Sequence, residues 1–168
     1  MKTKNKRTLY LVQSALVAGL YVAVTYASNP ISYGSVQFRI SEALTVLPVL
    51  TPAAVPGLTI GCLIANLGSP FGPIDIVCGT LATFLAAICT RLTRKIRFKN
   101  LPLLSLVFPV LFNGLIVGAE IAFFMPEGFS WLAFLTSGLS VALGEAGVCY
   151  ILGLPLYTGL NKTRIFEK

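Results

Sequence analysis

The chain has 168 residues, of which 55% are hydrophobic and only 11% are charged, and its mean hydropathy is +0.82. These values exclude an ordinary soluble globular domain. Apolar runs recur along the whole length, so the sequence predicts a polytopic all-α membrane protein with a single transmembrane domain over residues 1–168.

The formal net charge of +7 is compatible with nucleic-acid binding until its distribution along the chain is considered. Twelve of the thirteen basic residues lie in three short segments, at residues 2–7, 91–99 and 162–168. Such clusters mark the cytoplasmic ends of membrane helices. The positive charge therefore reports membrane topology, and nucleic-acid binding is excluded. Arg39 is the exception, because it lies outside the three clusters.

The apolar runs predict six helices, at residues 9–27, 39–50, 54–67, 73–94, 101–124 and 131–160. The first run has full membrane length and no obvious cleavage site, so we expect it to remain as a helix and not to be removed as a signal peptide. A single crossing by residues 39–67 would deliver the second basic cluster to the outside. Two crossings, joined by a turn at Thr51 and Pro52, keep all three clusters inside. The prediction is a six-transmembrane-helix bundle with both termini cytoplasmic.

The second and third predicted helices are short for a full span and are interrupted by Pro48, Pro52 and Pro56. Short or interrupted helices are tolerated at membrane depth where they are buried in protein or line a cavity. The sequence therefore predicts a binding cavity beside them.

The segment YGSVQFRISEALTVLP, residues 33–48, carries the most informative pair of charges. Arg39 and Glu42 are three residues apart, so at helical spacing they share one face, close to Gln37 and Ser41. Charges at membrane depth are costly and usually functional. The alternative is that the two side chains only pair with each other, with Glu42 favourably placed near the start of a helix.

Four of the six acidic residues lie within or at the edge of predicted helices: Glu42, Asp75, Glu120 and Glu145. Arg39 alone opposes them, so the cavity suits a cationic or donor-rich ligand. Structural alternatives remain open. Asp75 follows Gly-Pro and can cap its helix, Glu120 can reach water at the outer interface, and Asn66 and Asn113 can be ordinary interhelical hydrogen-bonding residues. Glu145 is the hardest to explain structurally, because it lies deep in the last helix.

Small residues recur every four positions on the first helix, at Ala15, Gly19 and Ala23. Such a stripe allows helices to approach closely in lipid. It is compatible both with packing inside the bundle and with docking onto a separate protein.

Several kinds of chemistry are excluded by what the sequence lacks. It has no His, no GxxxxGK[ST] loop, no HExxH and no GxSxG motif, so an enzyme with hydrolytic or metal chemistry is not expected. The four cysteines lie in apolar segments without CxxC spacing, which indicates neither a metal site nor a disulfide framework. No cofactor is expected, and a binding subunit that takes its energy from partner proteins fits these absences.

Two segments, YGSVQFRISEALTVLP and NLGSPFGPIDIVCGTLAT, resemble the QueT-type substrate-binding subunits of energy-coupling factor (ECF) transporters. The resemblance covers essentially the whole chain. It implies capture of a queuosine-related 7-deazaguanine (the aminomethyl precursor base, queuine or queuosine) from outside a bacterial-type plasma membrane. It also implies docking on a transmembrane coupling protein (EcfT-type) that carries two ATPase subunits, through a surface matching Ala15, Gly19 and Ala23. The central Gly19 departs from a strict Ala pattern.

A deazaguanine edge offers a ring N–H and an amine that one carboxylate accepts together, while its carbonyl needs a donor such as Arg39, Gln37 or Asn66. Its aminomethyl group is cationic and needs a second carboxylate. Aromatic rings at Tyr33, Phe38, Phe71 and Phe112 are candidates for stacking, and the segments at residues 31–38 and 68–74 are expected to close over the ligand. The candidate ligand-binding residues are Gln37, Phe38, Arg39, Glu42, Asn66, Phe71, Asp75, Asn113, Glu120 and Glu145.

Two other functions remain open at this point. The chain can be a subunit of the same class for another vitamin-like purine or cationic ligand. It can also be a standalone proton-coupled carrier that uses Glu145 or Glu120 as a relay. A purely structural membrane protein is disfavoured by the cost of so many intramembrane carboxylates.

Overall fold

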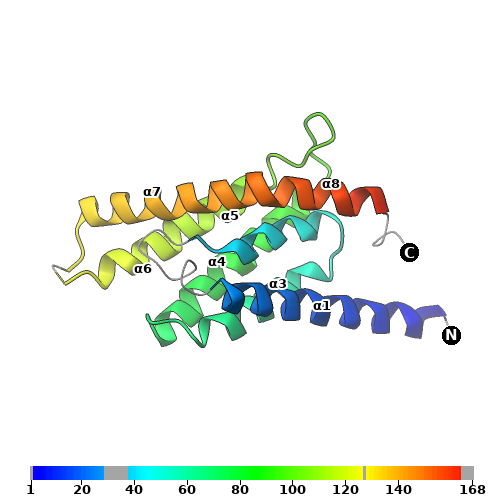
Figure 1. Cartoon of the computed structure of the whole chain (residues 1–168), viewed down its shortest axis with the longest axis horizontal. Coiled ribbons are helices and arrows are strands. Elements are labelled where there is room, and N and C mark those ends of the chain that lie inside the picture. Colours follow the sequence, from blue (N-terminus) through cyan, green and yellow to red (C-terminus); the bar gives the residue numbers. More distant parts are fainter. Residues whose placement is uncertain (1, 29–37, 127, 164–168) are drawn as a thin grey trace.

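The computed structural model describes residues 2–28, 38–126 and 128–163, with side chains from Lys6 onward. These residues form an elongated bundle of helices (Figure 1). The predicted all-α fold is confirmed.

The first half of the bundle contains separate helices, and the second half contains two long helical runs with changes of pitch inside them. The separate helices are α1 (Lys2–Ala27), the 3₁₀ helix η1 (Ile40–Val49), α3 (Ala54–Asn66) and α4 (Pro73–Leu92). One run consists of α5 (Val107–Phe112), the π-helical turn η2 (Asn113–Val117) and α6 (Gly118–Phe123). The other consists of α7 (Trp131–Gly147), the π-helical turn η3 (Val148–Gly153) and α8 (Leu154–Thr163).

Three helices in the described part of the chain are long and apolar enough to cross a membrane: Lys6–Ala27, Pro73–Leu92 and Trp131–Thr163. Shorter apolar helices cover Ile40–Val49, Ala54–Asn66 and Val107–Phe123. The prediction that the second and third helices are short is therefore confirmed.

The prediction of an α-helix at residues 39–50 is wrong about the type of helix. Residues 40–49 form a 3₁₀ helix, and Arg39 precedes it in an extended conformation, with φ −87° and ψ 95°. A rise of about 2.0 Å per residue gives ten residues a length of about 20 Å, against a hydrocarbon core about 30 Å thick. Because Arg39 lies outside the helix, the prediction that it shares a helical face with Glu42 is also wrong.

The fifth helix starts at Val107 and not at residue 101 as predicted. Lys99 and Asn100 have positive φ angles of 49° and 65°, and the turn that they form pairs Phe98 with Leu101. Side chains from other helices then hold the backbone of the next residues: Tyr150 donates to the Leu103 carbonyl at 2.9 Å, and Thr90 donates to the Ser105 carbonyl at 2.9 Å. These side-chain bonds occupy carbonyls that a helix would have used.

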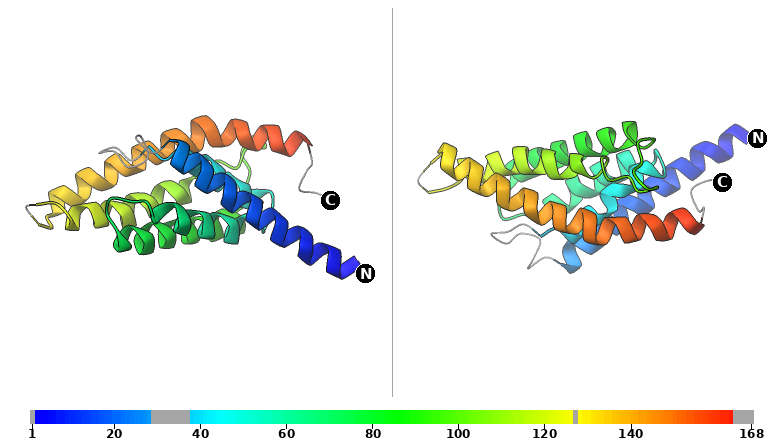
Figure 2. Two further views of the ribbon diagram at one scale, coloured as in Figure 1. Left: turned by 60° about the horizontal axis from the view of Figure 1, so that its bottom comes forward. Right: turned by 90° about the horizontal axis from the view of Figure 1, so that it is seen from above.

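Helix α1 packs against α3, α3 packs against α4, and η1 packs against η3. Figure 2 shows α1 crossing the other helices obliquely. Glycines allow the close approach of α1 and α3. A Cβ atom on Gly57 would lie 2.7 Å from the Ser14 carbonyl oxygen, and one on Gly61 would lie 2.9 Å from the Tyr21 Cβ. The inner face of α1 is thus set against α3 at backbone distance.

The two ends of the bundle differ in composition. The start of α1, the end of α8 and the basic turn that follows α4 lie at the same end (Figure 1). Aromatic rings gather where α6 and α7 meet at the other end. The Phe123 and Phe129 ring centroids are 4.6 Å apart, and those of Phe129 and Trp131 are 5.6 Å apart. Aromatic residues of this kind are typical of a membrane interface.

Candidate functional site

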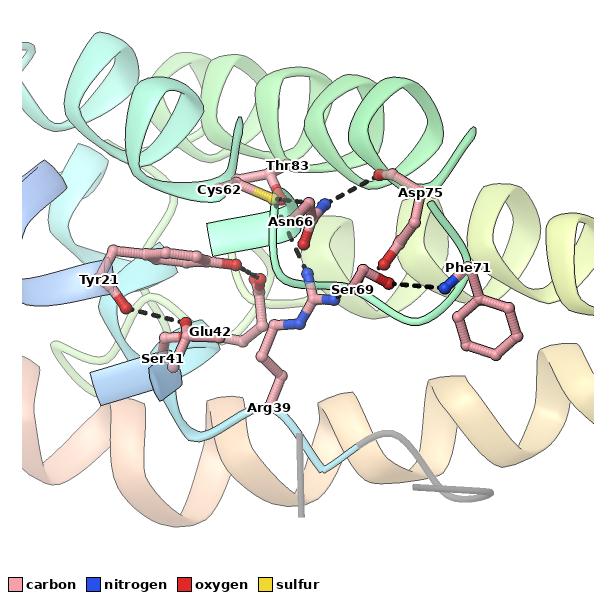
Figure 3. A network of polar contacts seen from close by, with 11 residues as sticks. Tyr21, Arg39, Ser41, Glu42, Cys62, Asn66, Ser69, Phe71, Asp75 and Thr83 are labelled. Atoms are coloured by element: carbon pink, nitrogen blue, oxygen red, sulfur yellow. Dashed lines mark hydrogen bonds and ion pairs between the residues drawn. The ribbon is translucent and has the colours of Figure 1, made fainter. Parts of the chain in front are cut away.

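A network of polar side chains lies inside the bundle, where α1, η1, α3 and α4 meet (Figure 3). Arg39 at its centre is only 5% exposed and Glu42 is 1% exposed. The Arg39 guanidinium lies between the Glu42 and Asp75 side chains (Figure 3). Its Nη2 atom is 3.9 Å from Asp75 Oδ2, which forms an ion pair between the start of η1 and the first turn of α4.

Helix α1 enters the network through Tyr21 and Thr25. The fully buried Tyr21 hydroxyl donates a hydrogen bond to the Glu42 carboxylate. The Thr25 hydroxyl donates to the Ser41 hydroxyl at 2.7 Å. A buried tyrosine hydroxyl needs a partner, so these contacts fix the position of η1 against α1.

Cys62 and Asn66 extend the network into α3. The Cys62 sulfur lies 3.3 Å from the Thr83 hydroxyl, 3.6 Å from Asn66 Nδ2 and 3.8 Å from Arg39 Nη1. Asn66 Nδ2 also donates to the Asp75 carbonyl at 2.9 Å. The two helices α3 and α4 are thereby held together beside the Arg39 guanidinium (Figure 3).

Helix α7 closes the network on the opposite side from α3. The Cys149 sulfur lies 3.8 Å from Glu145 Oε2 and 3.7 Å from the Glu42 carbonyl oxygen. The Phe38 ring packs against Gly147, where an added Cβ would lie only 3.2 Å from the ring. Glycine at this position therefore makes room for an aromatic ring beside the network.

Arg39 lies between two of the four predicted carboxylates, those of Glu42 and Asp75 (Figure 3). Glu42, Asp75 and Arg39 interact electrostatically, and so do Glu145 with both Glu42 and Arg39. Glu120, which comes from α6, interacts in the same way with Asp75 and Arg39. The fold thus brings together side chains from η1, α4, α6 and α7.

Many acceptor atoms of this cluster have no hydrogen-bond partner among the described residues. They are Glu42 Oε2, Asn66 Oδ1, both carboxylate oxygens of Asp75 and both of Glu120. Asn113 Nδ2 is a buried donor in the same situation. Leaving buried polar atoms unpaired costs about 1–3 kcal/mol each, so the arrangement suits a ligand that brings several hydrogen-bond donors.

The structure bears on the structural alternatives for Asp75 and Asn66. Gly72 is the residue that caps α4, and no side-chain bond caps this helix, so Asp75 does not act as its cap. Asn66 does bridge two helices, but only through Nδ2, and its Oδ1 has no partner within the described chain.

The aromatic candidates lie in different places. The Phe71 ring points away from the network (Figure 3), and Phe112 packs against the apolar cluster of Ala82, Val117 and Val141. Gln37 and Tyr33 lie outside the described residues. Phe38 is therefore the candidate ring that the described residues place beside the network.

Sequence reasoning missed several neutral members of the network: Tyr21, Thr25, Thr45, Cys62, Thr83 and Cys149. Tyr21 and Thr25 had a signal, because a tyrosine and a threonine one turn apart in an apolar helix point to a polar contact. The others fit apolar helices without any distinguishing pattern. No group of three or more His, Cys, Asp or Glu in the described ranges could hold a metal ion.

An apolar helical chain that encloses an arginine and several carboxylates is typical of a membrane protein in which charged side chains mark a substrate or ion pathway. Fold and site together define a membrane transport protein.

The chain belongs to the QueT transporter family, whose model matches residues 11–162. One similar protein is the Queuosine precursor transporter QueT of Lactococcus lactis subsp. cremoris (strain MG1363), which is 38% identical over 84 residues. The match covers 49% of this chain and 49% of that relative, about half the length of each. No solved structure matches the chain. The predicted family resemblance is confirmed, and the family is one of transporters and not of enzymes.

Proposed function

We propose that the chain is the membrane-embedded substrate-capture subunit of an ECF-type ABC transporter that imports a queuosine-related 7-deazaguanine. The ligand is the aminomethyl precursor base, queuine or queuosine. The name of the Lactococcus relative, a queuosine precursor transporter, supports this substrate class. The energy comes from a separate transmembrane coupling protein and ATPase subunits.

The set of unpartnered acceptors around Arg39 is the observation that carries the proposal. A deazaguanine presents a ring N–H and an exocyclic amine side by side, and a carboxylate such as Asp75 or Glu42 accepts both. The ligand carbonyl then accepts from Arg39, the only basic residue of the cluster. Phe38, which is 37% exposed and lies beside Gly147, offers its ring for stacking.

The outer face of α1 supports the assignment of a separate coupling protein. Ala15, Gly19 and Ala23 are all exposed, and a Cβ atom on Gly19 would have no described atom within 4 Å. In lipid, helices pack closely through small residues of this kind. We assign this face to the coupling protein, since the sequence contains no ATP-binding loop of its own.

The proposed topology has six transmembrane segments in the plasma membrane, with both termini and the turn after α4 in the cytoplasm. Basic residues at one end of the bundle support it, because positive charge accumulates on the cytoplasmic side. The aromatic group around Trp131 then marks the outer interface.

The test is calorimetric binding of queuine, the aminomethyl precursor base, queuosine and guanine to the detergent-purified chain. Arg39→Ala and Glu145→Gln are measured beside the wild type, with Val77→Leu, on an exposed position of α4, as the control. We expect tight binding of the deazaguanines, much weaker binding of guanine, and loss of affinity in both site variants. Binding of none of them by the wild type would refute the substrate assignment.

Energy coupling is tested separately in liposomes. The chain alone should bind substrate without accumulating it, whereas addition of a coupling protein and its ATPases should give ATP-dependent uptake. Concentrative uptake by the chain alone, abolished when the proton gradient is collapsed, would refute the coupling assignment and favour a proton-coupled carrier.

A further inference from the structure

A cleft separate from the central network lies between α4 and the run formed by η2 and α6. Its volume is about 590 Å³, and it is lined by Ile74, Cys78, Leu115, Ile116, Ala119, Glu120, Phe123 and Phe124. Glu120 is the only charged residue of this lining. Its side chain is 5% exposed, and neither carboxylate oxygen has a hydrogen-bond partner among the described residues.

Glu120 differs in this respect from the other three carboxylates of the cluster. Glu42 accepts a bond from the Tyr21 hydroxyl, and Asp75 faces the Arg39 guanidinium. The Glu145 carboxylate has the Cys149 thiol nearby. A buried carboxylate that lacks such a contact is costly, so Glu120 calls for a cation or a strong donor from outside the described chain.

The cleft adjoins the central network through the first turns of α4. Ile74 and Cys78, which line the cleft, precede and follow Asp75 on that helix. Glu120 also interacts electrostatically with both Asp75 and Arg39. Glu120 therefore lines the same cleft as the turns of α4 that carry Asp75.

We propose that the Glu120 cleft is a side pocket for the positively charged amine substituent of the ligand. This inference rests on the proposed function and assigns the protonated aliphatic amine, which all three proposed ligands carry, to Glu120. The walls at Ile74, Ile116 and Phe123 are apolar, so an ammonium group in the cleft has Glu120 as its one charged partner among the lining residues. Neutral analogues of the same ring use the central network but gain nothing from the cleft.

The experiment compares two ligands of the same ring system: 7-aminomethyl-7-deazaguanine and 7-cyano-7-deazaguanine, in which a nitrile replaces the amine. Binding to the full chain in detergent is measured for the wild type, Glu120→Gln, Ala119→Leu and Glu145→Gln. The first variant removes the charge and keeps the shape, and the second keeps the charge and fills the cleft. Val77→Leu, at an exposed position outside the cleft lining, is the control for added volume.

We expect the wild type to prefer the amine, and Glu120→Gln to lose about 10- to 100-fold in affinity for the amine. The same variant should change affinity for the nitrile less than about 3-fold, because the ring contacts remain. Ala119→Leu should reduce amine binding in the same selective way. Retained nitrile binding also shows that both variants are folded.

Four results would overturn the proposal. Equal wild-type affinity for amine and nitrile, or equal losses for both ligands in Glu120→Gln, would remove the side pocket and leave the proposed function intact. Selective loss in Glu145→Gln in place of Glu120→Gln would move the cation site to α7. Failure of the wild type to bind either deazaguanine would refute the proposed function itself, and the side pocket with it.

Discussion

The two faces of α1 carry the same kind of small residue in different surroundings. Ser14 and Ala18 face α3, where Gly57 and Gly61 bring the two backbones into contact. Gly19 follows Ala18 directly in the sequence, yet no described atom lies within 4 Å of the position that its Cβ would occupy. One face is thus part of the bundle, and the other is available to lipid or to a second protein.

This difference shows that small residues at intervals of four do not by themselves identify a partner surface. Close packing inside the bundle uses the same residue types as docking between proteins. The inner face is distinguished by polar residues among the small ones, since Tyr21 and Thr25 follow Ser14 and Ala18 toward the network. Substitutions on the two faces should therefore have different consequences.

The largest effect on stability is expected for Gly57→Leu on the side of α3 that contacts α1. Any side chain at this position meets the Ser14 carbonyl oxygen at 2.7 Å, which is backbone and cannot rotate away. We expect the free energy of unfolding to fall by about 3 kcal/mol. Unfolding in mixed detergent micelles measures it. An unchanged unfolding transition would contradict the packing of α1 on α3.

Tyr21→Phe should have the next largest effect, because it removes the hydroxyl that donates to Glu42 and leaves a buried carboxylate oxygen unpaired. We expect a loss of about 1–3 kcal/mol in stability, together with weaker ligand binding. The control is Tyr26→Phe, since the Tyr26 ring is exposed and its hydroxyl lies 3.5 Å from the Ile64 carbonyl. Equal effects of the two substitutions would argue against a special role for Tyr21.

Thr25→Val removes the second polar contact of the inner face, the hydrogen bond to Ser41, and keeps nearly the same side-chain shape. The hydroxyl donates to Ser41, so its removal should cost about 1 kcal/mol. Thr136→Val is the matched control, because the exposed Thr136 bonds only to carbonyls of its own helix. The free energy of unfolding of both variants is measured, and Thr25→Val should lose more than Thr136→Val. A larger loss for Thr136→Val would contradict the expectation.

Gly19→Leu on the outer face should have the smallest effect on stability, within about 0.5 kcal/mol of the wild type. Ligand binding by the isolated chain should also persist. Under the proposed coupling, however, uptake in liposomes that contain the partner proteins should be lost, because a bulky side chain prevents close helix contact. Normal uptake by this variant would remove the outer face of α1 from the docking surface.

The positions of helices could be predicted where turn residues or charged residues border an apolar run. Helix α4 begins at Pro73, directly after Gly72 with its φ of +70°, and ends at Leu92 beside the basic cluster. Helix type was not predictable for η1, η2 and η3. Their residues are as apolar as those of the α-helices. The 3₁₀ helix η1 packs against the π-helical turn η3, which is far away in the sequence. The change of helix type therefore goes with a tertiary contact that the local sequence does not show.

The candidate site likewise contains residues that could be predicted from the sequence and residues that could not. Its charged members were identified from sequence because a charge inside a membrane is costly and therefore conspicuous. Cys62 and Thr83 were not, because a thiol or a hydroxyl can satisfy itself on its own helix at little cost. Their role depends on which helices become neighbours, and only the assembled bundle reveals that.

Trp131 has a practical consequence for biophysical work on this protein. It is the single tryptophan of the sequence and is 73% exposed at the aromatic end of the bundle. Intrinsic tryptophan emission therefore comes from one known position outside the charged network. In vesicles that contain brominated lipids, quenching of this emission would measure how deep that end lies in the bilayer, with no label attached to the protein.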